Sequence, residues 1–142
     1  MSVTGAEAFE AGKWIKKQVE AELGDAISGA WLDVIPEGAA FPAVKFNVQN
    51  SMDVHTVAEH IVFTRLTFQV VGAIENEEVV PHVDIVTRIN LALHRRNGET
   101  PTHRILSCRR IQTINIPDIE QGRVFRMSGG IYELLVQAKS PD

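Results

Sequence analysis

A glycine pair interrupts the longest strand-like run of the chain, Gly122 to Ala138, with the sequence GRVFRMSGGIYELLVQA. After Gly130, apolar residues occupy both alternating sets of positions, which predicts a strand covered on both faces. Adjacent glycines weaken a strand, so they indicate a bulge, a sharp bend or a close approach of another backbone. The run exceeds the usual strand length. A long bent strand can serve two sheets or pair with a neighbouring molecule.

Two segments of the chain have helical periodicity. The first runs from Thr4 to Glu22, with a capping box formed by Thr4 and Glu7 and a stop at Gly24. The second has Pro81 in its first turn and ends at Asn97-Gly98, and its expected inward residues are Ile85, Ile89, Ala92 and Leu93.

Four more segments have the composition of strands, covering residues 30–35, 44–49, 60–74 and 103–116. We expect turns at Pro36-Glu37-Gly38, at Asn50 to Asp53 and at Pro117-Asp118. Ser51 to Glu59 reads as a polar connection. The order of helix, three strands, helix and two long strands predicts one α+β domain over residues 1–142. Its mainly antiparallel, mixed sheet would have about five strands, with both helices packed on one face.

Charge and cysteine content limit the possible partners. The net charge is −4, which argues against broad contact with nucleic-acid phosphates, although basic pairs occur at Arg95-Arg96 and Arg109-Arg110. The single cysteine, Cys108, excludes an intrachain disulfide and favours a reducing, cytosolic origin. No apolar run has the length of a membrane span, and the acidic N-terminus is unlike a signal peptide.

Motifs of known chemistry are absent from the sequence. No histidine pair has the i,i+4 spacing of a helical zinc site, and there is no Cys-x-x-Cys or Gly-x-Ser-x-Gly. Cys108 alternates with apolar positions, which predicts a small buried hydrophobic residue. Pro117-Asp118 lacks the following Glu-x-Lys of a metal-dependent nuclease. We therefore predict no catalytic residue, no metal site, no cofactor and no enzymatic activity.

Features typical of assembly are present instead. Trp14 lies about half a turn from the apolar stripe of the first helix, which predicts either a surface residue or an anchor in a subunit interface. On the strand at 60–74, one side carries Arg65, Thr67 and Gln69, which is too polar for a deep core. We expect that side to contact water, a ring lumen or a partner.

Short motifs along most of the chain carry a family resemblance. They are Phe41-Pro42-Ala43-Val44, Ile89-x-x-Ala92-Leu93-His94, Ile105-x-x-Cys108-Arg109-Arg110 and Phe125-Arg126-x-Ser128-Gly129-Gly130-Ile131-Tyr132. With the N-terminal helix, this combination resembles the tail terminator (tail completion) family of long-tailed bacteriophages.

The resemblance implies a structural virion protein, assembled in the host cytoplasm. It would form a ring, expected to be a hexamer, on the head-proximal end of the tail tube. There it would stop tube polymerisation and present a surface to the head–tail connector, while DNA passes through the lumen without specific binding. A net negative ring would repel that DNA. The candidate interface residues are Trp14, Arg65, Thr67, Gln69, Arg123 and Arg126.

Two alternatives stay open at this level. The chain is compatible with another head–tail joining component, such as a neck or head-closure protein. It is also compatible with an enzyme or small-ligand module, which would require His82, Asp84 and Cys108 to meet in one pocket.

Overall fold

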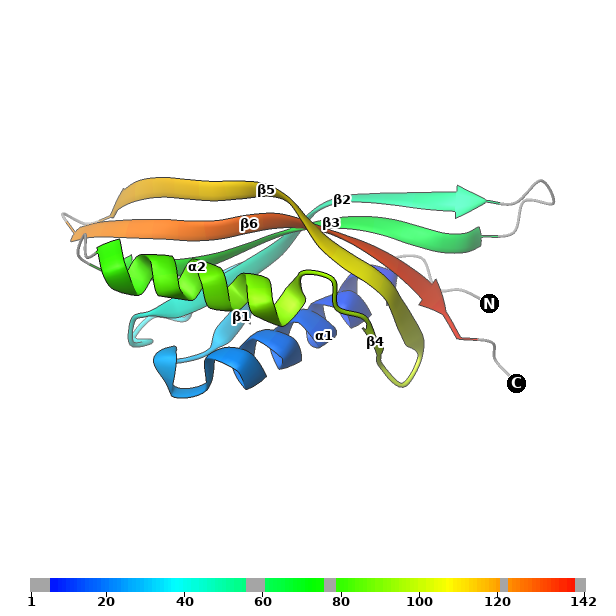
Figure 1. Cartoon of the computed structure of the whole chain (residues 1–142), viewed down its shortest axis with the longest axis horizontal. Helices are drawn as coiled ribbons and strands as arrows, with labels where there is room; N and C mark the ends of the chain where they lie inside the picture. Colours follow the sequence, from blue (N-terminus) through cyan, green and yellow to red (C-terminus); the bar gives the residue numbers. More distant parts are fainter. Residues whose placement is uncertain (1–5, 56–60, 76–78, 121–122, 140–142) are drawn as a thin grey trace.

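Two helices pack on one face of a twisted six-stranded sheet (Figure 1). The computed structural model describes residues 6–55, 61–75, 79–120 and 123–139. The side chains at element ends, residues 54–55, 61–62, 75, 79–83, 117–120 and 123–125, lie outside that description. Helix α1 (Ala6–Leu23) leads into a 3-10 turn, η1 (Gly24–Ala26), and helix α2 is Val79–Leu93. The strands are β1 (Ala30–Leu32), β2 (Ala43–His55), β3 (Ile61–Glu75), β4 (Gly98–Glu99), β5 (His103–Glu120) and β6 (Arg123–Ala138).

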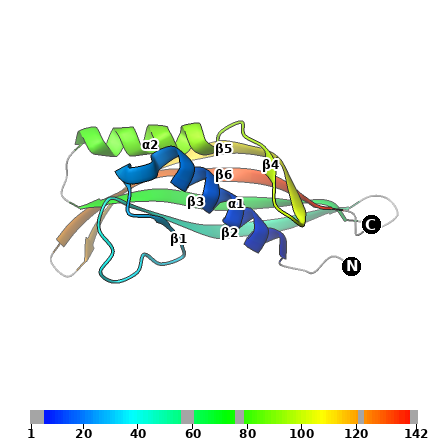
Figure 2. The same ribbon diagram turned by 90° about the horizontal axis from the view of Figure 1, so that it is seen from below.

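The α+β prediction with both helices on one face is confirmed, and Figure 2 shows α1 and α2 on the same side of the sheet. The strand order is β1-β2-β3-β6-β5-β4, so the final strand occupies the centre of the sheet. Among the described strands, only the β1–β2 pair is parallel. The central position of β6 explains why its second half is apolar at both alternating sets of positions. The sixth strand, which the sequence did not predict, is the two-residue β4.

Gly129 and Gly130 lie where β6 is held closest to its two neighbours. A β-carbon on Gly129 would run into the backbone carbonyl of Val70 on β3, and one on Gly130 would lie 2.8 Å from the carbonyl oxygen of Gln112 on β5. The predicted close approach is confirmed. The nearby β-bulge is not on β6 but on β5, where the register shifts between Arg110 and Gln112.

The core lies between the helices and the inner face of the sheet. Tyr132 is its largest fully buried side chain, and its hydroxyl donates to Oδ1 of Asn90 on α2 at 3.2 Å. Arg88 of α2 donates to the carbonyl oxygens of Glu22 and Leu23, which satisfies the C-terminal end of α1. The predicted inward residues of α2, which are Ile85, Ile89, Ala92 and Leu93, are buried, and Ile15 and Val19 form the buried side of α1.

The prediction that Trp14 lies outside the buried stripe is wrong. Its side chain is 4% exposed and belongs to the core cluster. The segment between α2 and β5 passes over this side of α1 and brings Gly98 against the indole, because a β-carbon on Gly98 would overlap Nε1 of Trp14. Trp14 is thus buried within its own subunit, which leaves almost none of its surface to anchor a partner.

Two predicted turns are extended strand. The β5 strand continues through Pro117, which pairs with Arg126, to Glu120. Proline is tolerated there because β4 covers only the start of β5, so this part of β5 is a sheet edge. The β2 strand continues through Asp53, whose carboxylate accepts from the Thr64 hydroxyl of β3 at 3.0 Å. The predicted polar connection therefore begins as strand, and residues 56–60 lie outside the described part.

Candidate functional site

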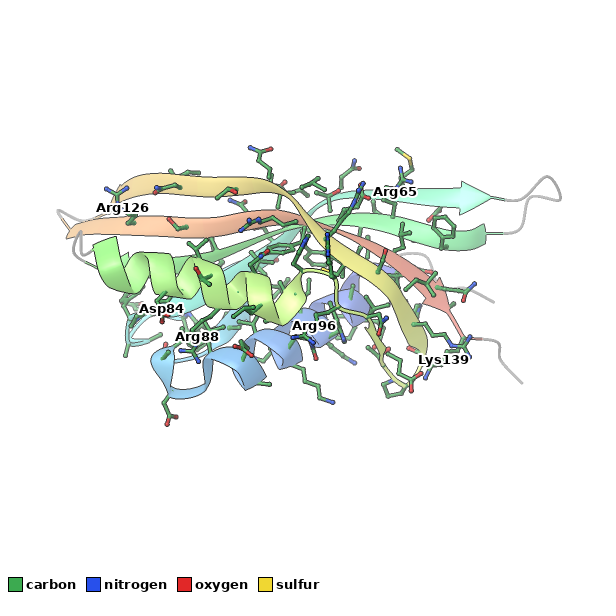
Figure 3. All side chains as sticks on the ribbon, in the orientation of Figure 1. Arg65, Asp84, Arg88, Arg96, Arg126 and Lys139 are labelled. Carbon is green, nitrogen blue, oxygen red and sulfur yellow. The ribbon has the colours of Figure 1, made fainter. Side chains whose placement is uncertain are left out.

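Alternation along β3 places Arg65, Thr67 and Gln69 on the face of the sheet that points away from the helices, called the outer face below. Their neighbours Leu66, Phe68 and Val70 are buried on the helix side. Figure 3 shows Arg65 on the side opposite the helices. Arg65 is exposed, while Thr67 and Gln69 are half-buried. The prediction of a polar side on this strand is confirmed.

Register across the sheet assembles the outer face from four strands. We call a set of residues that are paired side by side across the strands a row. One row contains Asn50, Thr67, Glu133 and Arg109, and the next contains Met52, Arg65, Leu135 and Ser107. Nη2 of Arg109 donates to Oε1 of Glu133 at 3.2 Å, and Nε donates to the same oxygen at 3.3 Å. The Gln49 side-chain amide donates to Oε1 of Gln69 at 3.2 Å. Hydrogen bonds between strands therefore hold part of this surface in one arrangement.

A compact apolar spot interrupts the polar surface beside the glycine pair. Val71 and Ile114 flank Gly129 in one row of the outer face and are buried. Gly129 lies so close to β3 that a β-carbon on it would meet the backbone of Val70 and Val71. Close packing at this point accompanies the strong twist of the sheet, whose strands cross near the middle of β6 in Figure 1.

Cationic side chains gather on the outer face, although the chain as a whole has a net charge of −4. Lys45 on β2 and Arg104 on β5 join Arg65 and Arg109. The described carboxylates of this face are Glu133 and Glu99, which pairs with Arg104 from β4 and lies 3.1 Å from Nζ of Lys139. With Lys139 beside Glu99, five cations against two carboxylates correspond to a formal charge of +3. Of these cations, the sequence placed only Arg65 in a candidate interface and indicated Arg109 only as part of a basic pair.

A β-bulge hides this grouping from the sequence. Arg104 and Arg109 are an odd number of positions apart, which in a regular strand puts two side chains on opposite faces. The register of β5 shifts between Ile105 and Ser107, so Leu106 is an extra residue and both arginines lie on the outer face. A bulge has no reliable signature in a single sequence.

The two remaining predicted interface residues are on β6. By strand alternation, Arg126 shares the helix-side face with Ser128 and Tyr132 and not the outer face with Arg65, and its part in an interface stays a prediction. Its Nη1 donates to Oδ1 of Asn115 at 3.1 Å, and the Ser128 hydroxyl donates to the same oxygen at 3.2 Å. Arg123 pairs with Glu120 in the hairpin, and its side chain lies outside the described part.

The residues proposed for a small-molecule site do not come together. Cys108 is buried in the core, where burial raises the pKa of its thiol to about 12. Asp84 lies near the start of α2 with its side chain 62% exposed, whereas Cys108 accepts a hydrogen bond from Arg95 beyond the other end of that helix. His82 has no described side chain. Within the described residues no three His, Cys, Asp or Glu side chains are grouped as metal ligands.

A polar cluster that the sequence did not indicate joins α1 to the start of β5. His103 is buried, with Nε2 4.0 Å from Oε1 of Glu7 and Nδ1 2.8 Å from the Thr102 hydroxyl. Burial would raise the pKa of the nearby Glu10, but hydrogen bonds with Thr100 and Thr102 and the Lys13 charge hold it below its usual value. These contacts fasten the β4–β5 turn to α1, which is a structural role.

No protein-family model matches this chain, and no curated protein matches it. Neither helix of the described structure combines the length and the hydropathy required to cross a bilayer.

Proposed function

We propose that this chain is a tail-terminator-like structural protein of a bacteriophage virion, which forms a closed ring on the head-proximal end of the tail tube. The observation that carries the proposal is the pair of open strand edges on opposite sides of one sheet. The resemblance in the sequence supplies the biological setting, and the edges supply a physical means of assembly.

The first open edge is on β2. Strand β1 pairs only with Val44, Lys45 and Phe46. On the side away from β3, β2 therefore has no neighbouring strand from residue 47 to 55 within the described chain. In the paired part, the Val44 N–H and the Phe46 carbonyl point outward, to Gly29 and Asp33. Allowing for the bulge between Val48 and Asn50, the outward-pointing groups continue at Ser51.

The second open edge is on β5, at the far side of the sheet. Strand β4 pairs only with Arg104 and Ile105. Residues after α2 then bond the next backbone groups of this edge. The Arg95 N–H donates to the Cys108 carbonyl, and the Arg110 N–H donates to Nδ1 of His94. From residue 112 to 120, β5 has no further strand beside it within the described chain.

Two different edges on one subunit suit a head-to-tail interface. A head-to-tail contact generates a ring when the rotation between subunits closes, and main-chain hydrogen bonds between added strands supply affinity. In the proposed assembly, the β2 edge of one copy meets the β5 edge of the next, and six copies complete the ring. One rim then contacts the tail tube protein, and the opposite rim contacts the head–tail connector.

Light scattering and electron microscopy test this proposal, with the protein alone and with purified tail tube protein. We expect a ring many times the 15.7 kDa subunit mass. Ser51→Pro removes an outward N–H and should give monomers, whereas Ser51→Ala keeps the N–H and should assemble normally. Thermal melts check that both variants are folded.

Three outcomes would contradict the proposal. A strict monomer, with and without tube protein, would reject the ring. Normal assembly of Ser51→Pro would reject the β2 edge as the contact. In infected cells, loss of the protein should give overlong tails, and unattached tails of normal length would assign it to another head–tail joining role.

A further inference from the structure

The outer face carries cations that have no acidic partner among the described residues. Its two described carboxylates are already bonded to other cations, Glu133 to Arg109 and Glu99 to Lys139. Lys45, Arg65 and Arg104 form no ion pair with any described residue. The Arg65 and Arg104 side chains are exposed, so their charge is available to a partner.

The spacing of these charges determines the size of ligand they can hold. Arg65 and Arg109 are separated by two strand spacings and one step along the strands, and the same holds for Arg65 and Arg104. At about 4.8 Å per strand and about 6.6 Å per pair of residues, each separation is roughly 12 Å. Lys45 lies in the row of Val71, three such steps along the strands from Arg65, or about 20 Å away. One carboxylate or phosphate ion cannot contact the whole set, so the ligand that matches all of these cations is an extended polyanion.

The side chains between the cations favour a sugar–phosphate backbone over an acidic protein surface. Thr67, Gln69, Gln49 and Gln112 contribute hydroxyl and amide groups, which together with arginine and lysine make most phosphate contacts in protein–DNA complexes. The centres of protein–protein interfaces are instead depleted of charged residues and enriched in aromatic ones.

We propose that the outer face of the sheet binds the backbone of double-stranded DNA without reading its sequence. Arg65, Arg104, Arg109 and Lys45 contact phosphates, and the neighbouring amide and hydroxyl groups add hydrogen bonds. This binding goes beyond the proposed ring, in which DNA has no assigned contact. It depends on the fold of one subunit, so it is testable whether or not a ring forms.

The assay is fluorescence anisotropy of a short labelled DNA duplex, with salt varied from about 25 to 200 mM. Each neutralised phosphate contributes about 0.9 to the slope of log affinity against log salt, so three or four contacts predict a slope near −3. Duplexes of unrelated sequence should bind equally. The double variant Arg65→Gln, Arg104→Gln should lower the slope by about 2 and weaken binding at the lowest salt by about tenfold or more.

Two matched variants test whether a loss of binding comes from the outer face itself and not from the change in net charge or from unfolding. Lys13→Gln with Lys17→Gln changes the net charge equally on the exposed side of α1, and it should bind as the parent does. Arg65→Lys with Arg104→Lys keeps both charges and should restore most of the affinity. Thermal melts confirm that each variant is folded.

Several results would overturn the assignment. It fails if the parent shows no salt-dependent binding at the lowest salt, or if the α1 variant weakens binding as much as the outer-face variant. If Arg65→Gln with Arg104→Gln loses self-association while DNA binding is unchanged, the face belongs to another copy of the chain. This assay measures DNA affinity, whereas ring formation is measured by particle mass. A negative result for DNA binding therefore does not decide whether the ring forms.

Discussion

The contact between Trp14 and Gly98 predicts a specific non-additivity between two substitutions. Trp14 is 4% exposed, and the Gly98 backbone lies so close to the indole that a β-carbon at position 98 has no room. Removing the indole should destabilise the fold and should also create the space that a β-carbon at position 98 needs.

The magnitude follows from the burial of the indole. Truncating a buried tryptophan to alanine costs about 3–5 kcal/mol. For 142 residues, an unfolding entropy of about 2.1 cal/mol/K per residue gives roughly 0.3 kcal/mol/K, so Trp14→Ala should lower the Tm by about 10–17 °C. Gly98→Ala in the parent should cost about 1–3 kcal/mol through overpacking, and close to nothing once Trp14 is alanine.

Urea unfolding of the four proteins of this cycle measures the coupling. We expect a coupling free energy of about 1–3 kcal/mol between the two sites. An equal cost for Gly98→Ala in both backgrounds would refute the contact. If Trp14→Ala costs less than about 1 kcal/mol and abolishes assembly, Trp14 is an interface anchor and the structural argument is wrong.

Two further predictions concern β6 and β5. Gly129→Ala should destabilise the fold by at least about 3 kcal/mol in urea unfolding, because its β-carbon meets the Val70 backbone, whereas Gly12→Ala, whose β-carbon makes an ordinary 3.5 Å contact with Phe46, should change stability by about 1 kcal/mol or less. Equal effects at both glycines would contradict the close approach. With the Cys108 pKa raised to about 12, the thiolate fraction at pH 8 is about 10⁻⁴, so iodoacetamide should modify the native protein at least about 1000-fold more slowly than the urea-unfolded chain. Rapid native labelling would show that Cys108 is not in the core.

Residue periodicity was enough to predict much of the architecture. Apolar spacing along both helices located their buried residues, and alternation on β3 separated Leu66 and Phe68 from Arg65 and Thr67. The glycine pair correctly indicated a close approach of neighbouring strands. These features are local, because the period of a helix or strand is set by its own backbone geometry.

Local signals were weakest where distant segments meet. Pro117-Asp118 has the composition of a turn, yet pairing with β6 keeps it extended at the sheet edge. Trp14 has the phase of a surface residue, yet the β4 segment covers it. In both cases a contact far along the chain outweighs the local preference.

The amino-acid sequence alone determined the α+β class, the two amphipathic helices and the long central strand, because hydrophobic periodicity is encoded residue by residue. Only the tertiary structure decided that β6 lies between β3 and β5, and that Arg104 and Arg109 share a face with Arg65. The physical reason is register: one extra residue at Leu106 moves the following side chains of β5 to the other face, and pairing with β6 determines where that residue is accommodated.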